Sequence, residues 1–233
     1  MKIALLGYGR MGKAIEQIAI QRGHEIVIKD DGNIEYDITI ADVAIDFSIP
    51  TVAFNNISKC LNNNVPVVSG TTGWLDKYDE AIALCNEKKG AFIYASNFSL
   101  GVNLFFEMNK QFAKMMTSLN DYTTTIEEIH HTKKLDAPSG TAITLAEGII
   151  ENSDKKEWSL DGESSEKNIP ITAIRTPEVP GTHTISYASE IDTIEIKHTA
   201  HNRKGFALGA VVASEWLFNK TGIYSMKDVL NIS

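Results

Sequence analysis

The segment at residues 128–142, EIHHTKKLDAPSGTA, places two histidines and two lysines within its first seven residues. Histidine can exchange a proton near neutral pH, and a lysine ammonium can bind a carboxylate. A helix is predicted to begin at Ser139, Gly140 and Thr141, so that their N–H groups and two hydroxyls form a second anion site. The segment therefore offers a proton donor and two separate anion sites, which suits a small dicarboxylate that gains a hydride and a proton.

Each side chain of this segment also has a structural interpretation. Strand alternation points His130 and His131 to opposite faces unless a bulge re-aims one of them. A single histidine is more often structural than catalytic, and Lys133 is then only a solvated charge. Ser139 is likewise a helix cap and Asp136 a turn former. Taken together, and beside the glycine loop described next, these residues favour a functional site.

A glycine-rich loop near the N-terminus, GYGRMG at residues 7–12, fits the pattern G-x-G-x-x-G. It follows a predicted strand and opens a predicted helix, which is the context that dinucleotide binding requires. Gly7 permits the tight turn, Gly9 lets the backbone approach a pyrophosphate, and Gly12 allows close packing of helix on strand. Asp30 lies eighteen residues beyond Gly12, where a carboxylate can bind the adenine-ribose hydroxyls. The alternative is a glycine turn without a ligand.

Lys29 leaves the choice of cofactor open. A cation beside the ribose can accept a 2′-phosphate, whereas Asp30 would repel one; a solvated Lys29 is the alternative. Two further loops, SGTTG and ASNFS, follow predicted strand ends, where ligands of such sheets bind. Residues 70–72 and 96–99 are therefore expected at the cofactor, with ordinary turns as the alternative for both.

The predicted secondary structure that positions these residues differs between the first and second parts of the chain. In the first part, short apolar runs alternate with helical patterns, which predicts a Rossmann-type, doubly wound parallel sheet. Its strands are predicted at residues 2–6, 24–28, 42–48, 65–73 and 90–99. The second part predicts an α+β domain with a mixed sheet, with helices at 102–116 and 139–152, strands at 122–131, 169–176, 181–189 and 192–200, and a polar surface loop at 151–168.

An apolar helix is predicted at residues 206–218, and we expect it to return to the first sheet, because a parallel sheet needs both faces covered. The dinucleotide-binding domain is therefore expected to comprise residues 1–101 and 203–233. Residues 102–202 form the second domain, and Arg203 is expected near the junction.

Composition and charge exclude several classes of protein. The 233-residue chain is 43% hydrophobic and 22% charged, and its formal net charge of -8 argues against nucleic acid as a partner. No apolar run approaches the ~20 residues needed to span a bilayer, so no membrane partner is expected. Cys60 and Cys85 have no metal-type partners in the sequence, so they are expected to be small buried residues in a reducing cytoplasm, and no metal is expected.

The pattern E-x-H-x-x-x-K-x-D-x-P-S-G-T-A at residues 128–142 resembles the signature of the 4-hydroxy-tetrahydrodipicolinate reductases, long called dihydrodipicolinate reductases. The motifs GYGRMG, DFSIP, SGTTG, SNFSLGVN and NRKGFALGAVVASEWL extend the resemblance over nearly the whole chain. Three features depart from the family pattern: the glycine loop is one residue shorter, Lys29-Asp30 replaces an acidic-then-basic pair, and the polar loop after Glu151 is short.

The resemblance implies that His130 is the general acid and Lys134 its catalytic partner. The substrate carboxylates would be bound by His131, Lys134, Ser139, Gly140 and Thr141. The cofactor, NADH or NADPH, would be held by Gly7, Tyr8, Gly9, Arg10, Met11, Gly12, Asp30, Gly70, Thr71, Thr72, Ser96, Asn97, Phe98 and Ser99. The second domain would bind a small cyclic dicarboxylate and assemble a homotetramer through its sheet.

The implied reaction belongs to the diaminopimelate pathway of lysine biosynthesis. The hydroxylated precursor loses water, NAD(P)H delivers hydride to C4 and His130 protonates C3, giving tetrahydrodipicolinate; domain closure would bring substrate and cofactor together. Another Rossmann oxidoreductase of amino-acid metabolism is one alternative, although Cys60 and Cys85 lie where no acyl-transfer nucleophile belongs. A non-catalytic dinucleotide sensor is the other, and it would have no use for His130 and Lys134 beside an anion loop.

Overall fold

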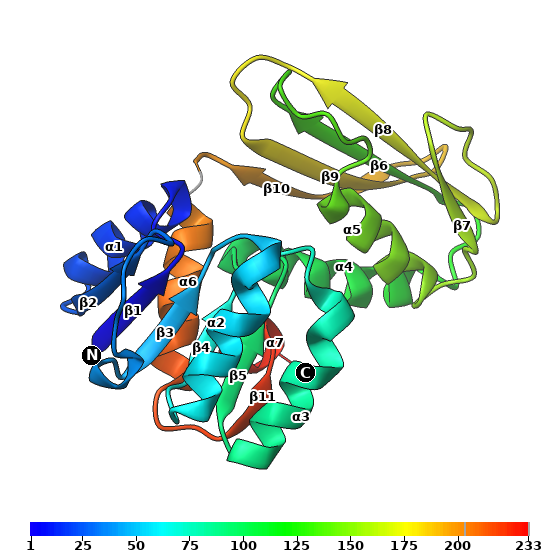
Figure 1. The fold of residues 1–233 in the computed structure, drawn as a ribbon. Helices are drawn as coiled ribbons and strands as arrows, with labels where there is room; N and C mark the ends of the chain where they lie inside the picture. The colour runs from blue at the N-terminus through cyan, green and yellow to red at the C-terminus, as the bar shows by residue number, and fades with distance from the viewer. Residues whose placement is uncertain (203, 233) are drawn as a thin grey trace. The chain divides into compact units, whose positions relative to one another are not determined.

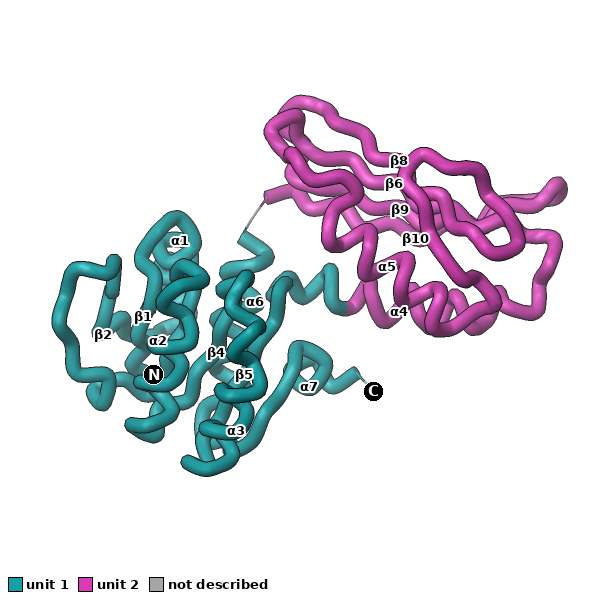
Figure 2. The backbone as a smooth tube through the Cα atoms, turned by 45° about the vertical axis from the view of Figure 1, so that its right-hand side comes forward, with its two compact units in different colours: residues 1–103, 204–233 teal, residues 104–203 magenta. Residues whose placement is uncertain are grey.

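The computed structural model describes residues 1–202 and 204–232, so that Arg203 lies outside the described residues. The chain divides into two compact units, residues 1–103 with 204–233 and residues 104–203 (Figure 2). None of the described helices is long and apolar enough to cross a bilayer.

The first unit is built on a six-stranded parallel sheet with the order β11-β5-β4-β3-β1-β2. Its strands are β1 (Lys2–Leu6), β2 (Glu25–Asp30), β3 (Val43–Asp46), β4 (Val67–Ser69), β5 (Ala91–Tyr94) and β11 (Gly222–Tyr224). The strand order reverses between β1 and β3, which is the edge where such sheets bind ligands. The predicted doubly wound sheet is confirmed, while β11 was not foreseen.

Helices cover both faces of this sheet, as a parallel sheet requires (Figure 1). They are α1 (Arg10–Gln21), α2 (Pro50–Asn62), α3 (Tyr78–Lys88), α6 (Lys204–Leu217) and α7 (Met226–Leu230), with short 3₁₀ turns at Ile38–Ile40 and Leu75–Lys77. One core joins α1 and α6 to the strands, and the other joins α2 and α3. Cys60 and Cys85 are buried free thiols of the second core, as predicted.

The second unit is built on a mixed sheet, as predicted; the sheet has five strands, one more than expected, in the order β10-β9-β6-β8-β7. The strands are β6 (Thr123–His130), β7 (Glu157–Leu160), β8 (Asn168–Arg175), β9 (Gly181–Ala188) and β10 (Thr193–Ala200). Strand β6 pairs parallel with β8 and antiparallel with β9. Helix α4 (Leu100–Met116), which begins in the first unit, and α5 (Gly140–Ile150) supply the helical part of its core.

The expected polar loop at residues 151–168 is partly wrong, because it contains β7. This four-residue strand, EWSL, is half exposed and pairs parallel with β8 at the edge of the sheet. Its four residues alternate polar and apolar, but this run is short and lies within a polar segment, so the sequence did not predict a strand; pairing with the edge of β8 makes it one.

Candidate active site

The glycine loop joins β1 to α1 with the geometry that its sequence predicts. Gly7 has φ +97°, and its N–H donates to the Asp30 carbonyl at 2.9 Å. A Cβ on Gly12 would lie 2.5 Å from the Gly7 oxygen, whereas a Cβ on Gly9 would meet nothing within 4 Å. Gly9 is also the N-cap of α1, and as a glycine it has no side chain to cap the helix. The first turn of α1 therefore presents orphan N–H groups at an open position, which fits a pyrophosphate.

Phe47, directly after β3, contacts the loops that lie at this edge of the sheet. Its carbonyl would lie 2.2 Å from a Cβ on Gly7, and its ring 2.3 Å from a Cβ on Gly70. The ring also packs against Phe98, with centroids 5.7 Å apart. A Cβ on Gly209 of α6 would approach the Phe98 carbonyl to 1.7 Å, so α6 packs closely against the loop that carries Phe98. The three cofactor segments predicted from separate motifs thus gather at one edge.

Asp46, at the end of β3, is a buried carboxylate that ties two of these loops together. It accepts hydrogen bonds from the hydroxyls of Ser48 at 2.6 Å, Ser69 at 2.9 Å and Thr71 at 2.7 Å. The amide of Asn56 on α2 donates a fourth at 3.0 Å. Burial raises the pKa of Asp46, and these four hydrogen bonds oppose the shift. The carboxylate fixes the position of Thr71, whose hydroxyl also accepts the Ser48 N–H at 2.9 Å.

The end of β2 carries the pair that bears on cofactor choice. The Asp30 carboxylate accepts the Gly32 N–H at 2.8 Å, which orients it at the sheet edge. The Lys29 ammonium lies 2.5 Å from the Glu16 carboxylate, which also accepts the Tyr8 hydroxyl. The hydrogen bond from Lys29, followed by that from Tyr8, lowers the pKa of Glu16. Lys29 is therefore engaged by Glu16, and the placement of Asp30 at the adenine ribose stays a prediction.

In the second unit, β6 ends at His130, and Glu128 lies two residues earlier in the same strand. The burial pattern of β6 puts both on the helix-covered face, while His131 follows the strand and is half-buried. Because β6 ends at His130, strand alternation does not place His131, and the expected opposition of the two histidines stays a prediction. The Nδ1 atom of His130 lies 3.5 Å from Glu128 Oε2, an ion-pair distance when the imidazole is protonated.

Glu128 is fully buried and is the anchor of this site. Its carboxylate accepts the Arg175 guanidinium at 3.0 Å and the Ser139 N–H at 3.0 Å. Burial acts to raise the pKa of Glu128, but the Ser139 and Arg175 hydrogen bonds and the His130 charge outweigh burial and hold that pKa below its usual range. Glu128 is therefore an anion that positions the end of β6, the end of β8 and the start of α5.

The two imidazoles on the helix-covered face stand in T-shaped contact, with centroids of His130 and His183 5.0 Å apart. Burial lowers the pKa of His130; Glu128 opposes this, and the cationic neighbours Lys134 and Arg175 add to it. Burial also lowers the pKa of His183 to about 4. A Cβ on Gly181 would lie 3.0 Å from His130 Nε2, so that glycine leaves room for the imidazole.

The lysines and the start of α5 complete the site. Lys134 is largely buried and donates to the Asp136 carboxylate at 2.7 Å, whereas Lys133 is exposed. Ser139 caps α5 as predicted, its hydroxyl accepting the Ala142 N–H at 3.2 Å. The same hydroxyl lies 3.1 Å from His183 Nε2.

Only part of the predicted anion site at the start of α5 is available to a ligand. The Ser139 N–H and hydroxyl serve Glu128 and the cap of α5, as described above. Gly140 and Thr141, in the first turn, have N–H groups without an intrahelical acceptor, so they are the part of this segment that remains suited to a substrate carboxylate.

Glu128, His130 and His183 place three potential metal-ligand atoms within 4.8 Å of one another. The carboxylate is already engaged by Arg175 and Ser139, and a guanidinium beside it disfavours a second cation. These contacts favour a hydrogen-bonded role for the cluster, and the expectation that no metal is needed stays a prediction.

Sequence reasoning did not assign a role to four residues of these sites: Glu128, Arg175, His183 and Asp46. Glu128 and Asp46 stand inside quoted motifs, but a carboxylate in a strand pattern gives no sign of burial. Arg175 and His183 come from β8 and β9, and only strand pairing brings them beside β6.

A parallel sheet with a glycine loop at its edge, in one chain with a mixed sheet that carries a buried cluster of two histidines and a glutamate, is typical of a two-unit dinucleotide-dependent oxidoreductase. Residues 1–98 match the family model for the dihydrodipicolinate reductase N-terminus, and residues 101–230 match that for the C-terminus. The chain belongs to the dihydrodipicolinate reductase family.

Relatives with known names are similar to the chain over nearly its whole sequence. It is 61% identical to a 4-hydroxy-tetrahydrodipicolinate reductase of Christiangramia forsetii, over 99% of this chain and 98% of that protein. It is 36% identical to the enzyme of the same name from Thermosipho africanus, over 99% and 98% of the two chains. A dipicolinate-bound dihydrodipicolinate reductase from a Paenisporosarcina species is similar in structure, with a TM-score of 0.77, 25% identity and 97% of each chain covered.

Proposed function

We propose that the chain reduces 4-hydroxy-tetrahydrodipicolinate, by way of dihydrodipicolinate, to tetrahydrodipicolinate in the diaminopimelate route to lysine. The observation that carries this proposal is a cluster in which His130 and the start of α5 contact buried Glu128, while Lys134 lies close enough to His130 for its charge to act on that imidazole. These groups supply the proton donor and the two anion sites that a cyclic dicarboxylate requires. We expect this enzyme to act in the cytoplasm.

The first unit would hold the dinucleotide on residues 7–12, Asp30, 70–72 and 96–99. The open position at Gly9 and the uncapped start of α1 support this fit. Reduced nicotinamide supplies the hydride when bound. We further propose that NADH is preferred over NADPH, because Asp30 would repel a 2′-phosphate while Glu16 engages Lys29.

The second unit would bind the substrate and protonate it. Lys134 exchanges its Asp136 partner for one substrate carboxylate, and His131 with the N–H groups of Gly140 and Thr141 binds substrate at the other side of the ring. His130 donates the proton to C3. Because the free site lowers the pKa of His130, arrival of a dianionic substrate favours the protonated imidazole that the reaction needs.

A homotetramer assembled through the second sheet is part of this proposal. Both helices of the second unit, α4 and α5, contribute to one core, which leaves the opposite face of the sheet for other subunits. Light scattering after size exclusion would give the mass of the assembly, and a monomer would contradict this part.

The experiment that tests the function follows NADH and NADPH oxidation with freshly generated substrate. Turnover that depends on that substrate is expected, with NADH giving the higher kcat/KM. Tight cofactor binding without turnover would instead indicate a dinucleotide sensor, and turnover with a different amino-acid intermediate would indicate another Rossmann oxidoreductase.

A further inference from the structure

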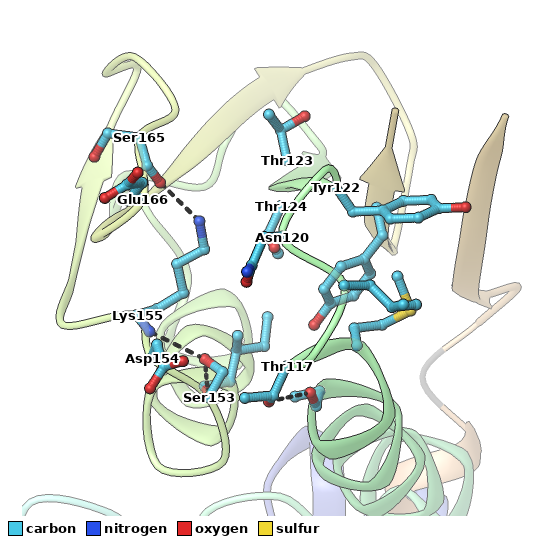
Figure 3. A pocket seen from close by; sticks show the side chains of 15 residues that line it. Thr117, Asn120, Tyr122, Thr123, Thr124, Ser153, Asp154, Lys155, Ser165 and Glu166 are labelled. Carbon is cyan, nitrogen blue, oxygen red and sulfur yellow. Dashed lines mark hydrogen bonds between the residues drawn. The ribbon is translucent and has the colours of Figure 1, made fainter. Parts of the chain in front are cut away.

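A pocket of about 460 Å³ lies within the second unit, at the end of the sheet where β6 begins (Figure 3). Its walls come from the last turns of α4 and α5, the start of β6 and the segments at residues 153–155 and 165–166. Pockets of this volume are of the size that binds small molecules.

The pocket is separate from the reductase site of the same unit. Thr124 lines the pocket at the start of β6, whereas His130 ends that strand six residues later. At ~3.3 Å per residue, the two positions are roughly 20 Å apart along the strand. None of the residues assigned to substrate or cofactor lines the pocket.

Tyr187, on the wall of the pocket, carries a buried hydroxyl. Its side chain is 3% exposed and lines the pocket, and among the described residues its hydroxyl has no hydrogen-bond partner. Burial raises the pKa of Tyr187 to about 12, so the hydroxyl keeps its proton at neutral pH. A buried hydroxyl without a partner costs about 1–3 kcal/mol, and such groups are uncommon in folded proteins. An acceptor supplied through the pocket would remove this cost.

Lys155 places a cation on the wall of the same pocket. Its ammonium donates to the Ser165 carbonyl at 2.7 Å, the contact drawn in Figure 3, and an ammonium has three donors in all. Burial lowers the pKa of Lys155, with the Glu166 carboxylate opposing the shift. Asp154 and Glu166 also line the pocket but are exposed, so that the negative groups lie toward solvent and the buried donor lies inside.

We propose that this pocket binds an apolar α-amino acid as a zwitterion. The ligand carboxylate accepts hydrogen bonds from the Tyr187 hydroxyl and the Lys155 ammonium. Its ammonium faces Asp154 and Glu166, and its side chain packs against the buried apolar residues Met116 and Ile149.

Met116 provides the reporter for the test, because it lines the pocket and is one of six methionines in the chain. The full-length protein is labelled with ¹³C at its methionine methyl groups, and the Met116 signal is assigned with Met116→Leu. L-norleucine is then added to 50 mM and the signal is followed by NMR. A saturable shift of the Met116 signal is expected; no shift up to that concentration overturns the proposal.

Matched ligands separate the two charged ends of the amino acid. Norleucinamide, which lacks the carboxylate, and hexanoate, which lacks the ammonium, are each expected to bind at least fivefold more weakly than norleucine. Equal binding of either analogue overturns the zwitterion assignment. A shift of equal size at all six methionines overturns the site.

Matched variants separate the buried hydroxyl from a neighbouring one. Tyr187→Phe is expected to weaken norleucine at least fivefold. Tyr122→Phe is the control, because Tyr122 also lines the pocket but its hydroxyl already donates to Asp192 at 2.5 Å. Unchanged reductase activity of both variants shows that they fold, and equal norleucine affinities would overturn the role of Tyr187.

Discussion

The Arg175 guanidinium donates to the buried Glu128 carboxylate across 3.0 Å, and the same Nη2 donates to the Asp136 carbonyl at 2.7 Å. One side chain of β8 thereby fixes both the end of β6 and the loop that carries Lys134. A buried charge of this kind is strongly destabilising if its partner is removed. The pair therefore links the position of His130, the proposed acid, to that of Lys134, the proposed substrate-binding lysine.

Glu128→Gln is expected to shift the pH dependence of kcat/KM. Glu128 raises the pKa of His130 against burial, so removing its charge lets that pKa fall further. A general acid is active below its pKa, so the loss of rate with rising pH should begin at lower pH in the variant. Glu127→Gln, on the adjacent position of β6, is the control and should keep the wild-type profile. Identical profiles for the two variants would contradict the role of Glu128.

His130→Gln should lower kcat strongly while KM changes little, because proton donation is expressed in the transition state. Loss of a positioned acid typically costs ~10²–10⁴-fold in rate. Steady-state kinetics with saturating cofactor measure both constants. A near-normal kcat would remove His130 as the acid and make His131 the candidate.

Lys134→Ala should raise KM and lower kcat together, because Lys134 is assigned to a substrate carboxylate and to the charge that develops during reduction. Exposed Lys133→Ala is the matched control and should have little effect. Cofactor affinity, measured by fluorescence titration, should survive both changes. An effect of Lys133→Ala as large as that of Lys134→Ala would show that net charge, and not position, explains the result.

Asp30→Ala should weaken NADH more than NADPH, because it removes the carboxylate at the ribose position and the repulsion of a 2′-phosphate. Glu16→Gln should improve NADPH binding, since it releases Lys29 from its 2.5 Å ion pair. Dissociation constants for both cofactors give the comparison. Equal weakening of the two by Asp30→Ala, or no weakening, would contradict the placement of Asp30 at the ribose.

His183 should make stability depend on pH. Its pKa is about 4 in the folded chain against about 6.5 unfolded, so between these values the unfolded chain binds the proton. Stability from this group is present above pH 6.5 and is lost as pH falls toward 4, by up to roughly 3 kcal/mol. Urea unfolding at pH 7 and pH 4.5 measures the loss. His183→Asn should reduce the difference between the two pH values, and an unchanged difference would contradict the assignment.

The sequence by itself determined the elements whose local signals are strong. The run at residues 2–6 became β1 with the same bounds, and Ser139 caps α5, because strand periodicity, glycine geometry and capping depend on neighbours in the chain. The fold class and the family followed from such local motifs, while the roles of the individual site residues stay predictions. The edge strand β7, of four residues within a polar segment, and the three-residue β11 gave too short a local signal and were missed.

Only the tertiary structure decided which groups are buried together. Glu128, Arg175 and His183 belong to three strands whose pairing sets β6 between β8 and β9, and Asp46 meets Ser69 and Thr71 because β3 lies beside β4. A carboxylate in a strand reads the same in the sequence whether it is exposed or buried. Burial and partner charges, which set the pKa of His130 and the state of Glu128, arise from residues far apart in the chain, so pairing and packing decide them.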